Sequence, residues 1–181
     1  IKNLNRANKL LKKTNSSSLN IKISEPKFET DILGKGLKLN GNKTLSSHKL
    51  VENFMIIANS CVGETLSKSR FSVIYRYHEK PNIFNLNKLN KKLSELGFGN
   101  GLKKTHPTQF NEIFNKKIDA HLKNLISIMI LQNMSQAYYS NDYSGHYGLS
   151  LNKYVHFTSP IRRYADLLIH RQLHAFLGWD S

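Results

Sequence analysis

Residues 154–171 read Y-V-H-F-T-S-P-I-R-R-Y-A-D-L-L-I-H-R, and this stretch decides the predicted fold of the chain. Its opening, 154–157, is rich in aromatic and β-branched residues, which predicts a short strand. Thr158 and Ser159 are capping residue types, and proline follows where proline starts helices, so we expect a helix over 160–176. The apolar side of this helix is predicted to comprise Ile161, Tyr164, Ala165, Leu168 and Gln172, widened by Leu167 and Ile169.

The start of this predicted helix carries the candidate chemistry. Arg162 and Arg163 fall in its first turn, where the helix dipole disfavours cations by about 0.3–1 kcal/mol. Two arginines in that position indicate a nearby anion, and phosphate suits the planar guanidinium. Arg162, Asp166 and His170 follow at intervals of four, so they are expected to form a row along the helix. From spacing alone, a row of solvated ion pairs worth about 0.3–0.5 kcal/mol each fits equally well.

The segment 156–171 resembles the signature of the RNB catalytic domain of the ribonuclease II and ribonuclease R exoribonucleases. In that family the segment lines the catalytic cavity, and the arginine matching Arg162 acts on the phosphate near the scissile bond. The resemblance implies that Arg162 is catalytic. The candidate RNA-binding residues around it are Arg163, Tyr154, His156, Thr158, Ser159 and Asp166.

Several of these residues have a second interpretation. Thr158 and Ser159 fit helix caps as well as ligands. Tyr154 and His156 point to the same side of their strand, where each side chain either touches RNA or packs. Arg163 either contacts a neighbouring phosphate or pairs with a carboxylate.

A second candidate catalytic residue, Glu52, lies in a predicted helix over 48–67. Apolar residues cover most of this helix, which predicts a buried central position, but Glu52, Asn59 and Gly63 interrupt them along one line. A carboxylate there is either salt-bridged in the core or faces a polar cavity. The segment S-H-K-L-V-E-N-F-M-I-I-A-N resembles the family segment in which a glutamate at the place of Glu52 reaches RNA, which favours the cavity.

The remaining patterns predict a mixed α/β fold that is rich in helix, with short and mainly antiparallel strands. Expected helices cover residues 1–13, 86–96, 107–114 and 119–137. Expected strands cover residues 19–23, a hairpin within 28–39, 71–77 and 146–151.

Three further segments support the resemblance, which covers the whole chain in order. R-Y-H-E-K-P at 76–81 resembles the family's R-V-H-E-P-P; we expect a structural turn there rather than a metal site at His78 and Glu79. S-Q-A-Y-Y-S at 135–140 and G-H-Y-G-L-S-L at 145–151 also resemble family segments. In ribonuclease II an aromatic residue stacks on a substrate base at the place of Ile21, where an isoleucine has no ring to stack and a core residue is expected.

The family's activity requires a cluster of aspartates that binds divalent metal. The aspartates of this chain, none of them closely spaced, are Asp31, Asp119, Asp142, Asp166 and Asp180. We therefore expect 1–181 to be a partial RNB catalytic domain, without metal ligands, the upstream aspartate block or flanking oligonucleotide-binding barrels. By resemblance, the parent protein is a magnesium-dependent 3′-to-5′ exoribonuclease that releases nucleoside 5′-monophosphates, whereas this segment alone is expected to be inactive. The alternative is a non-catalytic RNA-binding or regulatory protein.

The composition agrees with an RNA partner. The formal net charge is +15, which attracts polyanions, although an AT-rich coding bias that loads solvated faces with lysine is an alternative source. No apolar run reaches about 18 residues, so we expect no membrane span. The single cysteine, Cys61, fits a reducing cytoplasm. No protein partner is evident in the sequence.

Overall fold

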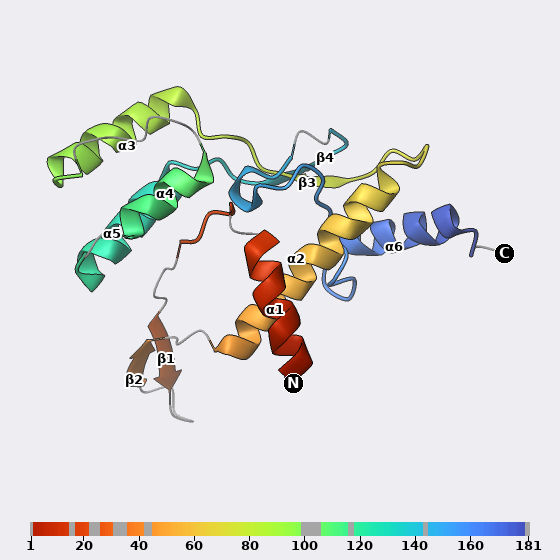
Figure 1. The fold of residues 1–181 in the computed structure, drawn as a ribbon, viewed down its shortest axis with the longest axis horizontal. Coiled ribbons are helices and arrows are strands. Elements are labelled where there is room, and N and C mark those ends of the chain that lie inside the picture. Colours follow the sequence, from red (N-terminus) through yellow and green to blue (C-terminus); the bar gives the residue numbers. More distant parts are fainter. Residues whose placement is uncertain are drawn as a thin grey trace.

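The computed structural model describes residues 2–14, 17–21, 26–30, 36–41, 45–98, 106–115, 118–142 and 145–179. Along the chain (Figure 1) its elements are α1 (Lys2–Thr14), β1 (Pro26–Thr30), β2 (Gly36–Gly41), α2 (Ser46–Leu66), β3 (Tyr75–Tyr77), α3 (Ile83–Glu95), α4 (Pro107–Phe114), α5 (Ala120–Gln132), β4 (Tyr138–Ser140), the 3-10 turn η1 (Tyr147–Leu149) and α6 (Tyr164–Leu177). The strands form two antiparallel pairs, β1 with β2 and β3 with β4. The predicted helix-rich fold with short antiparallel strands is confirmed. None of the helices within the described ranges is long and apolar enough to cross a membrane.

One hydrophobic core joins α3, α4 and α5. Leu86, Leu89 and Leu93 follow at helical spacing, so they share one face of α3 and are buried together. They pack with Phe110 of α4 and with Ile126 and Ile130 of α5. Side-chain caps begin α3 and α5: the Asn82 side chain accepts the Phe84 N–H at 3.0 Å, and the Asp119 side chain accepts the His121 N–H at 2.9 Å.

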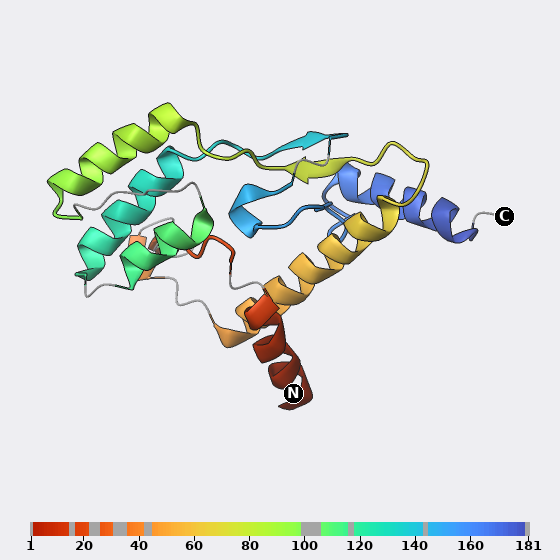
Figure 2. The ribbon, with the colours of Figure 1, turned by 45° about the horizontal axis from the view of Figure 1, so that its top comes forward.

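A second core joins α2, β3 and α6. Its buried members are Leu66, Val73, Tyr75, Val155 and Ile169. Figure 2 shows α3, α4 and α5 at one end of the molecule and α2 with α6 at the other, with β3 and β4 between them. The chain that precedes α6 therefore lies where the second core meets the β3–β4 pair.

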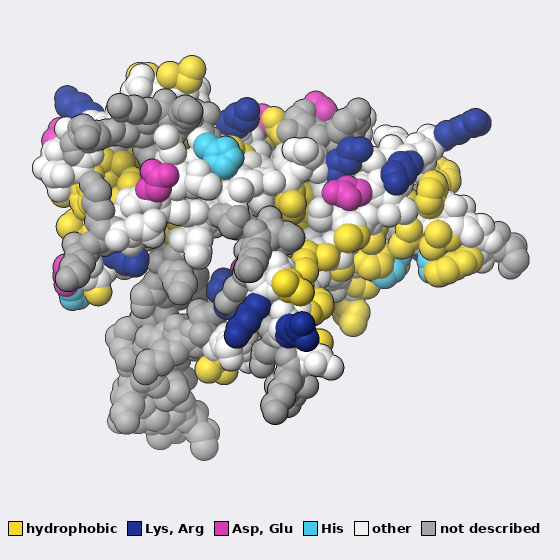
Figure 3. Space-filling view, viewed as in Figure 1, with side chains coloured by type: hydrophobic (Ala, Val, Ile, Leu, Met, Phe, Trp, Pro, Cys, Tyr) yellow, Lys and Arg dark blue, Asp and Glu magenta, His cyan; other side chains and the backbone are white. Residues whose placement is uncertain are grey.

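The helix α2 is less buried than the sequence predicted. Its buried residues are Asn59, Gly63 and Leu66, whereas Val51 is 54% exposed and Cys61 is exposed. Figure 3 shows apolar side chains gathered over α2 and α6 on one face of the molecule. The apolar circumference predicted a central helix, but within the described residues only the side that carries Asn59 and Gly63 is closely covered.

The structure corrects several of the expected elements, among them the strand over 154–157, which joins no strand ladder within the described residues. The strand predicted over 71–77 is reduced to β3, and the helix predicted to reach residue 137 ends at Gln132 because 138–140 pairs with β3 as β4. The expected strand 146–151 contains η1 instead, closed by a hydrogen bond of 2.7 Å from the His146 N–H to the Leu151 carbonyl. Of the strand expected over 19–23, residues 19–21 are not a strand, and the rest lies outside the described residues.

The last helix begins at Tyr164, four residues later than predicted. The Ser159 carbonyl accepts the N–H groups of both Arg162 (3.3 Å) and Arg163 (3.2 Å), so residues 159–163 form a turn instead of the first helical turn. The predicted apolar face is wrong at its start, since Ile161 is fully exposed and Tyr164 is 68% exposed, whereas Ile169 is buried as predicted. The buried residues of α6 are Asp166 and Ile169, because the second core lies on that side.

Candidate functional site

A buried carboxylate holds the turn that precedes α6. Asp166 has no exposed surface, and its Oδ1 accepts the Ser159 N–H and the Arg163 guanidinium, both at 2.8 Å. The predicted row of Arg162, Asp166 and His170 does not form, because Arg162 precedes the helix and Arg163 becomes the partner of Asp166. The His170 Nε2 lies 2.9 Å from the Phe157 carbonyl oxygen instead.

The two neighbouring arginines therefore differ in charge environment. Arg163 is compensated by Asp166, and its side chain is only 22% exposed. Arg162 is exposed and takes no part in the ion pairs found among the described residues, which are Lys49–Glu52 and Arg163–Asp166. A guanidinium without a carboxylate partner, carried on a hydrogen-bonded turn, is suited to bind an external anion.

The side chains of Thr158 and Ser159 do not cap the helix. Arg163 occupies the N-cap position of α6 in an extended conformation, without a side-chain capping bond. The Thr158 hydroxyl is buried and has no hydrogen-bond partner in the structure. The backbone of Ser159, rather than its hydroxyl, makes the bonds that close the turn.

Tyr154 and His156 belong to a cluster of rings beside the turn. Tyr154 is buried, its ring lies 5.9 Å from that of His156, and the His156 Nδ1 lies 2.8 Å from the Tyr139 hydroxyl. The Arg76 guanidinium lies over the Tyr139 ring at 4.9 Å. Burial, followed by the positive charge of Arg163, lowers the pKa of His156 from 6.5 to about 4, so its imidazole is neutral at neutral pH.

Asn59 links α2 to this cluster and was not among the predicted site residues. Its Nδ2 donates to the Tyr154 hydroxyl at 3.0 Å, and its Oδ1 accepts the N–H groups of Phe157 (3.0 Å) and Thr158 (3.2 Å). The signal for Asn59 was the line of polar interruptions that it shares with Glu52. Arg76 and Tyr139 were also missed, because each pattern alone indicates only a strand or a helix end.

Comparisons with known proteins identify the fold that carries this site. The RNB domain family matches residues 1–178. Ribonuclease R from Buchnera aphidicola subsp. Schizaphis graminum is 38% identical over 176 residues, which is 94% of this chain and 24% of that protein. The chain belongs to the RNB-domain exoribonuclease family. It spans about a quarter of the length of the ribonuclease R relatives that match most of it.

Solved RNB structures share the fold. The apo form of Mycoplasma genitalium RNase R superposes with a TM-score of 0.84 at 27% identity, over 92% of this chain and 27% of that protein. The same RNase R in complex with double-stranded RNA gives a TM-score of 0.81 at 26% identity, over 96% and 32%. Yeast Ssd1, described as a pseudonuclease, gives 0.64 at 27% identity, over 74% and 17%.

Glu52, the second residue predicted to be catalytic, is one of the residues that line a pocket, and its catalytic role stays a prediction. It pairs with Lys49 at 2.7 Å while remaining about half exposed, so it is not salt-bridged within a core. The pocket has a volume of about 630 Å³, and its lining includes Asn111, Lys123 and Ile21. Ile21 also packs against the first core, so it combines the predicted core position with a place at the pocket wall.

Helix geometry relates Glu52 to the turn. Glu52 and Asn59 are seven residues apart, which is two turns, so they lie on one face of α2 about 10 Å apart along its axis. The pocket reaches Ile56, one turn before Asn59. Both candidate catalytic residues are therefore positioned by one side of α2. Glu52 lies on that side of the helix, and Arg162 follows the segment that Asn59 binds.

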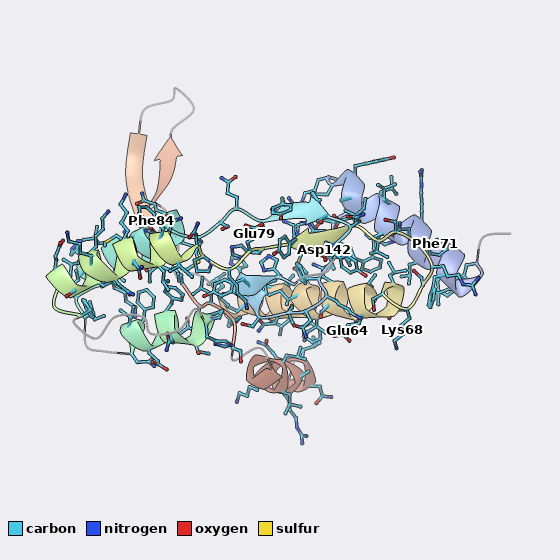
Figure 4. All side chains as sticks on the ribbon, turned by 90° about the horizontal axis from the view of Figure 1, so that it is seen from above. Glu64, Lys68, Phe71, Glu79, Phe84 and Asp142 are labelled. Atoms are coloured by element: carbon cyan, nitrogen blue, oxygen red, sulfur yellow. The ribbon has the colours of Figure 1, made fainter. Side chains whose placement is uncertain are left out.

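The structure supports a structural role for the His78–Glu79 segment. The His78 Nδ1 accepts the Gly148 N–H at 3.1 Å, and burial lowers its pKa. Glu79, on the connection between β3 and α3 (Figure 4), accepts the Tyr138 hydroxyl at 2.9 Å. Both residues tie β3 to later parts of the chain.

The RNB resemblance implies magnesium, and the residues described here do not fit a magnesium site. Within the part of the chain that the structure describes, no group of three or more His, Cys, Asp or Glu side chains could hold a metal ion. Magnesium ligation requires several oxygen donors. The Oδ1 of the buried Asp166 already accepts the Ser159 N–H and the Arg163 guanidinium.

Proposed function

We propose that this chain is part of a hydrolytic exoribonuclease that shortens RNA from the 3′ end and releases nucleoside 5′-monophosphates. In this proposal the segment supplies the wall of the RNA channel and the phosphate-binding arginine, Arg162. Membership in the RNB-domain exoribonuclease family supports the reaction, and the exposed Arg162 on its fixed turn is the observation that carries the role of this chain.

The proposed chemistry follows from the charge of the reaction. Negative charge grows on the phosphoryl oxygens when a phosphodiester is hydrolysed, and a guanidinium already in place stabilises that charge without rearrangement. Arg162 is free to do this because Asp166 takes Arg163 instead. Arg163 is then a support of the turn. Burial first, and then the positive charge of Arg163, lower the pKa of His156 to about 4, so that a neutral imidazole, hydrogen-bonded to Tyr139, lies beside the proposed phosphate position.

The pocket at Glu52 is the proposed site for the nucleotide next to the reacting bond. Its volume lies within the range of small-ligand sites, and its amide and lysine groups can bind the edges of a base or a sugar. RNA is the proposed partner, as in the RNase R complexes with RNA. Magnesium is proposed for the complete protein, and the cytoplasm remains the expected compartment.

The test uses the full-length gene product with magnesium and a single-stranded RNA that is labelled at its 5′ end in one experiment and along its whole length in another. We expect stepwise release of nucleoside 5′-monophosphates from the 3′ end. Arg162→Ala should lower kcat by about 10²–10³-fold, as expected for loss of one preorganised donor, and lower RNA affinity by far less. Arg171→Ala, at an exposed position on α6, is the matched control. A loss of affinity with kcat intact would refute the proposed role of Arg162.

A second candidate function is RNA binding without hydrolysis. The similarity to yeast Ssd1, a pseudonuclease, favours it, since an RNB fold occurs there in a protein described as lacking nuclease function. Tight RNA binding by the full-length gene product, with no release of mononucleotides in the presence of magnesium, would support this function over the first.

A further inference from the structure

A single asparagine joins the middle of α2 to the backbone that carries the arginine turn. Asn59 is 3% exposed, although asparagine is a poor helix former and a buried amide is costly without partners. Its Oδ1 uses both lone pairs, on the consecutive N–H groups of Phe157 and Thr158. Its Nδ2 donates to the hydroxyl of Tyr154.

The bonds to Oδ1 take the place of the hydrogen bonds that a neighbouring strand would make to this segment. Among the described residues, 154–157 join no strand ladder, although the Tyr154 carbonyl accepts the Arg76 N–H of β3 at 2.7 Å. The side-chain oxygen of Asn59 accepts the N–H groups of Phe157 and Thr158, as a carbonyl of a neighbouring strand would. Without it, two backbone donors next to the turn would have no partner, and an unpaired backbone donor is costly when it is buried.

One helical turn further along α2, Gly63 lets the same segment approach closely. A Cβ at Gly63 would lie 3.2 Å from the Lys153 carbonyl oxygen and 3.4 Å from the Tyr154 nitrogen. Asn59 and Gly63 thus form one contact face, on which the chain rests from Lys153 to Thr158. Figures 1 and 2 both show this part of the chain beside α2.

We propose that Asn59 is a positioning residue for the RNB reaction. Through Phe157 and Thr158 it fixes Ser159, whose carbonyl accepts the N–H groups of Arg162 and Arg163. The same helix carries Glu52 two turns away, so the bonds of Asn59 set the distance between the arginine turn and the pocket at Glu52. This inference rests on the proposed function of Arg162, although its structural part can be measured without activity.

Two variants of nearly equal shape separate the acceptor from simple packing. Asn59→Asp keeps an oxygen for both backbone N–H groups, and carboxylates are stabilised by such donors. Asn59→Leu keeps the branched outline of the side chain, with a somewhat larger volume, and has no acceptor. Asn82→Ala is the control, because the Asn82 side chain also accepts a backbone N–H, at the start of α3 and far along the chain from the turn.

The experiment measures two quantities in the full-length gene product: hydrogen exchange in peptides covering Phe157 and Thr158, and single-stranded RNA degradation. Asn59→Leu should speed exchange at these two amides and lower kcat by about 10–100-fold, since a displacement near 1 Å costs about that much, with KM little changed. Asn59→Asp should keep both quantities near those of the unsubstituted protein. Asn82→Ala should alter neither.

The outcomes distinguish this inference from the proposed function. Faster exchange in Asn59→Leu with kcat unchanged would show that Asn59 only stabilises the fold, and unchanged exchange would show that its bonds do not hold the segment; either result overturns the proposal. If Asn59→Leu does not fold, Asn59→Asp decides alone, and loss of kcat or of protection there overturns it. Failure of Arg162→Ala to lower kcat would instead reject the proposed function.

Discussion

At the scale of single residues, the most constrained group is the carboxylate of Asp166. It is fully buried, is bonded to a backbone N–H and a guanidinium, and leaves its Oδ2 and the Arg163 Nε without partners in this structure. Buried ion pairs of this kind add little net stability compared with an apolar pair, but loss of one partner leaves a buried charge. The pair is therefore a geometric constraint on the turn more than a source of stability.

Asp166→Asn should destabilise α6 and the turn because Arg163 loses its counter-charge. We expect the free energy of local opening, measured by amide exchange of α6 in the full-length gene product, to fall by about 3 kcal/mol. Lys49→Ala, which removes the exposed pair with Glu52, is the control and should cost at most about 1 kcal/mol. An equally small effect from both substitutions would contradict this account of Asp166.

The same residues show how far sequence could predict the site. The neighbourhood of Arg162, Arg163 and Asp166 was predictable because these residues are local in the chain. The partner of Asp166 was not, since the spacing of four applies only inside a helix and the turn displaced the helix start to Tyr164. Asn59 was visible as a polar interruption, but its partners lie almost a hundred residues away.

At the scale of elements, local signals were sufficient for helices and insufficient for strands. The leucine spacing of α3, the proline that starts α4 and the Asp119 cap of α5 each act within a few residues. The strand β4 was assigned to a helix end because its partner β3 lies about sixty residues earlier, and propensity does not report that pairing. The turn η1 was likewise hidden within a sequence of strand-forming residues.

Three histidines lie beside β3 and β4, and their lowered pKa values predict that the stability of the fold depends on pH. Burial lowers the pKa of His146 to about 4, as it does for His156, and also lowers that of His78. Four charged residues also act on the pKa of His156: Arg76, Arg162 and Arg163 lower it, and Asp166 raises it. Each histidine is neutral in the fold and has a pKa near 6.5 when unfolded, so protonation favours unfolding. The stabilisation is complete above about pH 6.5 and is lost progressively as pH falls toward 4.

We therefore expect the melting temperature of the full-length gene product to decrease as the pH is lowered from 7 to 5. The double substitution His146→Gln with His156→Gln removes two of the titrating groups and should flatten this decrease, whatever its effect at pH 7. A nuclear magnetic resonance titration in which His156 protonates near 6.5 in the folded protein would contradict the assigned environment.

At the scale of the whole molecule, the net charge of +15 has two possible sources, which are an RNA-binding site and general enrichment in lysine. Figure 3 shows Lys and Arg side chains scattered over the visible face rather than gathered in one patch. Under the proposed function, Arg162 is the exposed arginine of the turn before α6 and is expected to bind phosphate, whereas Lys88, Lys91 and Lys92 lie on the exposed side of α3.

The salt dependence of RNA affinity separates these charges. Each phosphate contact with single-stranded RNA contributes about 0.7 to the slope of log K against log salt concentration. Arg162→Ala should reduce this slope by about 0.7 in the full-length gene product, whereas the triple substitution of Lys88, Lys91 and Lys92 by Ala should leave it unchanged although it removes three times the charge. A slope that follows the number of charges removed, wherever they lie, would show that bulk electrostatics rather than the turn before α6 binds the phosphates.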